Sequence, residues 1–152
     1  MTDQIDPREI QALQAYLQEY GQQAEILTGQ LQMLEDGRME TLAAIEALKS
    51  LAAQGEQPVL LQIGGGAMVR AKIEAPDQVL VNIGADVTVE RTNSDAIEFL
   101  KDRITEMEAS VKKLVENIDR IRSQMNEISR RIETAYRQYQ AAGGGPPPAR
   151  TQ

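Results

Sequence analysis

Histidine, cysteine and tryptophan are all absent from this sequence of 152 residues, and its aromatic residues are four tyrosines and one phenylalanine. Without thiolates and imidazoles, the usual ligands of transition metals are missing, so we expect no metal site. The same absences exclude cysteine nucleophiles, histidine general bases and disulfides. Catalysis would need carboxylates, lysine, tyrosine or serine alone. The sequence therefore argues against an enzyme, and we assign no catalytic residue and no cofactor.

Long apolar runs and clusters of basic residues are also missing. No run approaches the ~20 apolar residues that span a bilayer, and the polar, acidic stretch 1–8 is unlike a signal sequence. The formal net charge of −7 disfavours nucleic-acid binding, because neutralising phosphates needs clustered lysine and arginine. Lack of cysteine favours a reducing compartment. We therefore expect a cytoplasmic protein with neither a nucleic-acid nor a membrane partner.

The first third of the chain has the periodicity of a coiled-coil helix. Asp6 can cap its start, Pro7 suits the first helical position, and Gly55 can end it. Arg38 and Thr41 interrupt an otherwise apolar seam. The seam residues step by three and four: Ile10, Leu13, Leu17, Tyr20, Ala24, Leu27, Leu31, Leu34, Ile45, Leu48 and Ala52.

Two features of this helix each leave two interpretations open. A glycine inside a helix lowers its stability by about 1 kcal/mol relative to alanine. The helix contains three of them, Gly21, Gly29 and Gly37, which either make the arm compliant or are tolerated changes on an exposed stripe. Arg38 either loosens the pair locally or fixes its register, or it covers apolar surface with its stem while its head reaches water.

A segment rich in valine, isoleucine and glycine follows the first helix. Its apolar runs are short and separated by turn residues, which predicts two β-hairpins. The expected strands are 59–63, 68–73, 79–83 and 87–91. The glycine triplet 64–66 fits a hairpin turn and not a nucleotide-binding loop, since no Lys-Ser or Lys-Thr pair follows it.

The last third of the chain predicts a second helix with an unbroken seam. The polar cluster 92–95 can cap its start. A 3.5-residue period over six heptads rarely arises by chance. Its seam residues are Ile97, Leu100, Ile104, Met107, Val111, Leu114, Ile118, Ile121, Met125, Ile128, Ile132, Ala135 and Tyr139. Glycines and prolines from residue 143 onward predict a disordered tail.

These elements predict a mainly α fold in four parts. Residues 1–56 and 93–142 form a long antiparallel two-helix coiled coil, 57–92 form two β-hairpins between the helices, and 143–152 form the tail. One helix pair cannot cover the apolar residues of four short strands, and the strands leave open edges. We therefore expect oligomerisation through the β segment. The residues assigned to it are Val59, Leu61, Ile63, Val69, Val79, Val81, Ile83, Val87 and Val89.

The order of these segments resembles the prefoldin family over nearly the whole chain before the tail. The specific part is an apolar strand leading into the triplet 64–66, then the stretch 79–92 (VLVNIGADVTVERT), then 96–100 (AIEFL) opening a helix. Two hairpins match the α class of this family, of the archaeal type, whereas β-class subunits are shorter and carry one hairpin.

The resemblance implies an ATP-independent holdase chaperone. Two α and four β subunits would join through an intersubunit β-barrel. Six coiled coils would then capture unfolded client proteins with their tips and deliver them to a group II chaperonin. A purely structural scaffold or tether without client binding is the other interpretation.

Apolar residues near the tips are the candidates for client contact. They are Ile5, Ile10, Leu13, Tyr16, Leu17, Ile132, Tyr136 and Tyr139. A fraying helix end can expose such residues to a client, although several of them could instead serve only to close the seam. Tyr16 and Tyr136 fall outside the heptad seam, so the seam does not account for them.

Overall fold

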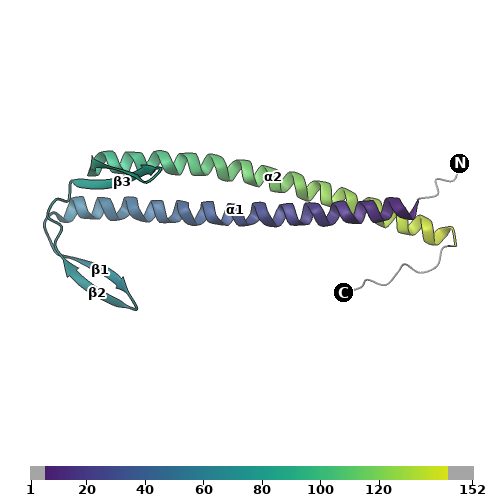
Figure 1. Ribbon diagram of the computed structural model, residues 1–152, viewed down its shortest axis with the longest axis horizontal. Helices are drawn as coiled ribbons and strands as arrows, with labels where there is room; N and C mark the ends of the chain where they lie inside the picture. Colours follow the sequence, from purple (N-terminus) through teal and green to yellow (C-terminus); the bar gives the residue numbers. More distant parts are fainter. Residues whose placement is uncertain (1–5, 144–152) are drawn as a thin grey trace. The chain divides into compact units, whose positions relative to one another are not determined.

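The computed structural model describes residues 6–143 as two long helices with two antiparallel hairpins between them (Figure 1). The predicted mainly α fold is confirmed. The elements in chain order are α1 (Pro7–Gln54), β1 (Val59–Gly64), β2 (Ala67–Ala71), β3 (Gln78–Gly84), β4 (Val87–Thr92) and α2 (Asn93–Ala141).

The described chain divides into two compact units, and both helices run through both of them. We call residues 6–32 and 112–143 the terminal unit, and residues 33–111 the hairpin unit. Each is described separately below. Neither helix is long and apolar enough to cross a membrane.

Local sequence sets both ends of α1. The carboxylate of Asp6 accepts a hydrogen bond from the backbone N–H of Arg8 at 3.0 Å, as an N-cap should. Pro7 occupies the first helical position, where its missing N–H costs nothing. Gly55 has a φ of 62°, a left-handed conformation that ends the helix. The predicted start and end of this helix are confirmed.

In the terminal unit the helices run antiparallel, since residues later in α1 contact residues earlier in α2. The Gln14 amide donates to the Tyr136 hydroxyl at 3.1 Å, and a Cβ built on Gly21 would lie 3.8 Å from the Met125 methyl. The seam residue Ile118 is only 4% exposed. The buried residues of this unit, Ile118 and Ala135, are predicted seam residues of α2, and the predicted seam residues of α1 are half-buried here.

The hairpin unit has the same pairing around Ile45 and Ile104, which are both buried. At the weak part of the seam, Thr41 is buried and its hydroxyl donates to the Gly37 carbonyl at 2.7 Å. Arg38 donates twice to the Glu35 carboxylate on its own helix, at 2.9 and 3.1 Å. Where the apolar seam is interrupted, Arg38 and Thr41 thus form hydrogen bonds with groups of their own helix.

Arg38 adds little to the register of the two helices. Its contact to α2, with the carboxylate of Glu108, is 3.9 Å long, and that carboxylate is 59% exposed. Exposed ion pairs contribute at most about 1 kcal/mol. The pairing of apolar seam residues must therefore set the alignment around this position.

Replacing Gly29 with alanine should raise the free energy of unfolding by about 1 kcal/mol, because alanine has the higher helix propensity. Nothing lies within 4 Å of the added Cβ. Thermal melting followed by circular dichroism measures the change. Gly21→Ala is the matched comparison, since its Cβ would meet the Met125 methyl at ordinary contact distance, 3.8 Å. An unchanged or lowered melting temperature for Gly29→Ala would contradict the prediction.

Each hairpin closes through left-handed backbone at its turn. Gly64, Gly65 and Gly66 have φ values of 113°, 59° and 80°, and the second turn places Ala85 and Asp86 at 49° and 59°. Glycine adopts this conformation without the steric cost that other residues incur. Both hairpins have a register irregularity next to their turn. The four predicted strands are confirmed to within two residues at each end.

Candidate functional site

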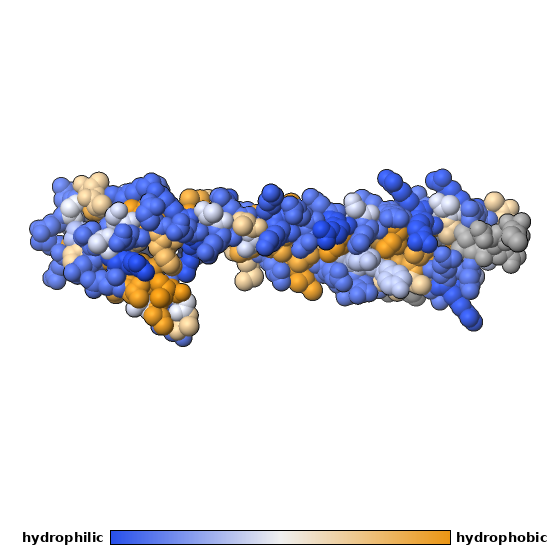
Figure 2. All heavy atoms as spheres, turned by 90° about the horizontal axis from the view of Figure 1, so that it is seen from above, coloured by the Kyte–Doolittle hydropathy of each residue, from blue (hydrophilic) through white to orange (hydrophobic). Residues whose placement is uncertain are grey.

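The β1–β2 hairpin carries apolar side chains that the described chain leaves uncovered. Every residue from 60 to 70 is exposed, and Figure 2 shows apolar surface gathered in the hairpin unit. The hairpin is flanked by Glu56 and Lys72, which form an ion pair across its base that is 4.0 Å long and exposed at both ends. Such a contact holds a hairpin weakly.

Both faces of this hairpin are apolar. Leu61 and Val69 pair directly across the two strands, so they share one face. Leu60 and Met68 lie one position away along their strands and therefore face the other side. All four are exposed. A hairpin with apolar side chains on both faces can pack between two other layers of protein.

The β3–β4 hairpin is linked to α2 by a hydrogen bond. The guanidinium of Arg103 donates to the backbone carbonyl of Asn82 at 3.3 Å and lies 5.2 Å from the centroid of the Phe99 ring. Val81 is 7% exposed. This hairpin therefore has one covered face, in contrast to β1–β2.

Asn93 joins three segments at the point where β4 passes into α2. Its side-chain amide donates to the Leu48 carbonyl of α1 at 3.0 Å. Its backbone N–H donates to the carboxylate and the carbonyl of Asp77, at 3.3 and 3.2 Å. The residue is 5% exposed, so these bonds are shielded from water and hold the junction in one geometry.

The residues predicted for oligomerisation differ in their surroundings. Val81 is buried within its own chain, so it is less available to a partner than its neighbours. Half-buried positions are Val59, Val79 and Val89. Exposed positions are Leu61, Ile63, Val69, Ile83 and Val87. The sequence argument passed over three exposed residues on the alternate faces: Leu60, Met68 and Leu80.

The predicted client-binding residues lie at the start of α1 and the end of α2, which we call the helix ends. Half-buried in the seam are Ile10, Leu13, Leu17 and Ile132. Tyr16 is 55% exposed and Tyr139 is also exposed, whereas Tyr136 is half-buried and accepts a hydrogen bond from Gln14. Ile5 lies outside the described residues. The helix ends thus bring most of the set together, with two tyrosines open to solvent.

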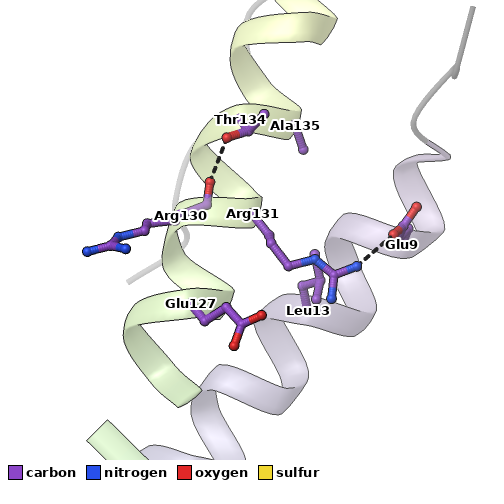
Figure 3. Close-up of a pocket in the computed structure, with 7 residues that line it drawn as sticks. All are labelled: Glu9, Leu13, Glu127, Arg130, Arg131, Thr134 and Ala135. Carbon is purple, nitrogen blue, oxygen red and sulfur yellow. Dashed lines mark hydrogen bonds and ion pairs between the residues drawn. The ribbon is translucent and has the colours of Figure 1, made fainter. Parts of the chain in front are cut away.

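A shallow, open pocket lies between the helix ends. Its lining residues are Glu9, Leu13, Glu127, Arg130, Arg131, Thr134 and Ala135 (Figure 3). Arg131 extends from α2 toward Glu9 on α1, 3.5 Å from its carboxylate, while Arg130 points away from α1. Leu13 is half-buried beside this exposed ion pair, and Ala135 is only 4% exposed. Such a surface offers limited hydrophobic contact at the helix ends.

The family profile described as "Prefoldin subunit" matches residues 20–138. This range includes most of both helices and both hairpins. The chain belongs to the prefoldin family. Membership implies a chaperone-type role.

Prefoldin subunits from archaea are similar to it over nearly their whole length. "Prefoldin subunit alpha" of Methanoregula boonei is 59% identical over 146 residues, covering 96% of this chain and 94% of that protein. The protein of the same name from Methanoculleus marisnigri is 55% identical, covering 94% and 98%. The resemblance to the α class of archaeal prefoldins is confirmed.

Solved prefoldin structures have the same fold. A chain of the filamentous PFD from Methanocaldococcus jannaschii, determined by cryo-EM, aligns with a TM-score of 0.67 and 24% identity, covering 78% of this chain and 98% of that one. The crystal structure of the prefoldin beta subunit from Thermococcus strain KS-1 aligns with a TM-score of 0.60 and 20% identity, covering 87% and 96%.

Proposed function

We propose that this chain is the α subunit of an ATP-independent holdase. Two copies join four prefoldin β subunits through an intersubunit β-barrel, and the coiled coils capture unfolded client proteins. The complex delivers these clients to a group II chaperonin in the cytoplasm, without a cofactor. Membership of the prefoldin family and the α-class relatives support this role.

The uncovered β1–β2 hairpin is the observation that carries the assembly part of the proposal. Leu61, Val69 and their neighbours would lose contact with water only in a larger complex, and apolar burial of that kind drives stable association. Residues 57–92 accordingly act as the assembly segment, while 1–56 and 93–142 form the arm. The remaining stretch, 143–152, lies almost entirely outside the described residues.

The helix ends support the client-binding part. Exposed Tyr16 and Tyr139 flank a seam whose residues are only half-buried there, so slight opening adds apolar surface. Contacts of this kind are weak and independent of sequence. They suit a protein that must hold many unfolded chains and release them to the next chaperone.

Deleting residues 1–15 and 133–152 tests client capture. The shortened chain should still assemble, because both hairpins and the buried residues Ile45, Ile104 and Ile118 remain. It should lose its suppression of the aggregation of reduced, guanidinium-unfolded lysozyme, which light scattering measures. Deleting 143–152 alone is the control and should change neither property. Full suppression by the chain that lacks both helix ends would refute client capture by the helix ends, whereas no suppression by the full-length complex would support the scaffold interpretation instead.

A further inference from the structure

A weakly polar stripe follows the outer side of α1 within the terminal unit. Its members are spaced alternately by four and three residues, so they share one helix face. We call them the outer stripe of α1: Ala12, Tyr16, Glu19, Gln23, Ile26 and Gln30. All six are exposed, and Ile26 is 63% exposed although it lies well inside the helix and outside the seam.

The charge of this stripe differs from that of α2 in the same unit. Between residues 9 and 37, α1 has no lysine or arginine, whereas the α2 segment 112–137 carries charged side chains in nearly every turn. Within residues 6–143, Glu19 and Glu25 form no ion pair, so both carboxylates can accept one from a partner. A partner that binds this face gains from positive charge.

The spacing of the two apolar members limits the shape of that partner. Tyr16 and Ile26 are ten residues apart, which corresponds to about 15 Å along a helix. An extended chain advances about 3.3 Å per residue and returns to the same side every second residue. Side chains four residues apart in an extended segment are therefore separated by roughly 13 Å on one side, which matches the two anchors.

The polar members of the outer stripe, Glu19, Gln23 and Gln30, add polar recognition. Glu19 lies between Tyr16 and Ile26, so a lysine or arginine midway between the partner's apolar side chains can reach its carboxylate. Gln23 and Gln30 each offer amide donors and an acceptor. These groups can bond to the unpaired backbone N–H and C=O groups of an extended chain without requiring a sequence.

We infer that the outer stripe of α1 binds extended segments of unfolded clients that carry two apolar side chains four residues apart with a lysine or arginine between them. The inference rests on the proposed holdase function. It adds a recognition surface along the helix, with a preference for basic segments, to the apolar contacts at the helix ends.

Fluorescence anisotropy with the assembled complex tests the preference. The probe is a labelled serine-based peptide with leucines four residues apart and a lysine midway. Two comparison peptides replace the lysine with glutamate or place the leucines side by side. We expect the first peptide to bind about tenfold more tightly than either comparison peptide. Equal binding of all three, or tighter binding of the glutamate peptide, overturns the inference.

Variants then locate the site. Ile26→Gln should weaken binding of the lysine peptide about tenfold, and Glu19→Gln should reduce the preference for lysine over glutamate. Val115→Gln is the matched control, because Val115 is an exposed aliphatic residue on the charged helix, 40% exposed. Val115→Gln should change neither the affinity for the lysine peptide nor the preference for lysine over glutamate. An unchanged melting temperature for Ile26→Gln shows that the fold is intact, and unchanged peptide binding by that variant refutes the site.

The aggregation assay separates this inference from the proposed function. If deleting the helix ends abolishes suppression while Ile26→Gln has no effect on peptide binding, the holdase function stands and the outer stripe is refuted. If neither change alters any assay, client capture by the helix ends and by the outer stripe are both refuted. Reduced peptide binding by Ile26→Gln together with lost suppression on deletion supports both.

Discussion

Replacing Leu61 with aspartate is expected to release this chain from its assembly. Leu61 is 48% exposed in the described chain and pairs with Val69 across an uncovered hairpin. If a partner subunit covers this face, the substitution places an unpaired carboxylate in an apolar interface. A buried, unpaired charge costs about 3–5 kcal/mol, which corresponds to more than 100-fold weaker association. Native mass spectrometry of the tagged chain, recovered from the lysate of its own host, measures the loss.

Gln62→Asp is the matched control for this substitution. Gln62 is the next residue along β1, so its side chain points to the other face of the hairpin. Both changes introduce the same residue into the same strand, and therefore carry the same cost in strand propensity. We expect Gln62→Asp to keep more of the assembly than Leu61→Asp. The reverse order would assign the main contact to the face of Leu60 and Met68, and equal, full assembly would refute joining through β1–β2.

Replacing Ile118 with aspartate is expected to destabilise the helix pair more than any other single change considered. Ile118 is 4% exposed in the terminal unit, where the partner helix covers it. Burial of an uncompensated carboxylate there should lower the free energy of unfolding by about 3–5 kcal/mol. Thermal melting followed by circular dichroism at the helical band measures the change.

The matched control lies three residues earlier on the same helix. Val115→Asp introduces the same charge at a side chain that is 40% exposed, so water can solvate it. We expect its effect to stay within about 1 kcal/mol. Equal melting temperatures for the two variants would show that the seam of α2 is assigned to the wrong face.

Most of the fold could be predicted from the sequence, because its signals are local and repeated. The seam period, the Asp6-Pro7 start and the glycine triplet each depend on nearby residues. The interruptions of the apolar seam in α1 were harder to interpret. Thr41 fits the seam because its hydroxyl bonds to the Gly37 carbonyl, and a Cβ on Gly37 would lie 3.8 Å from Met107 of α2. Such arrangements depend on which atoms each side chain contacts after folding.

The candidate site was less predictable, because exposure depends on which faces the rest of the chain covers. Alternation assigned Val81 and Leu61 to the same group, yet one is buried against its own chain and the other is exposed. Leu60, Met68 and Leu80 were passed over because they occupy the alternate positions of their strands. The hydrogen bonds of Asn93 that fix one hairpin link residues as far apart as Leu48, so no local pattern could reveal them.

The antiparallel pairing also has a consequence for the order in which the chain folds. The Leu48–Asn93 bond encloses 45 residues of separation, whereas the Gln14–Tyr136 bond encloses 122. Closing the longer loop directly costs about 1 kcal/mol more in entropy, so contacts near the hairpins should nucleate and the rest should zip outward. The helix ends would then form last and open first. Hydrogen exchange should be slowest around Asn93 and fastest around Gln14, where clients are proposed to bind.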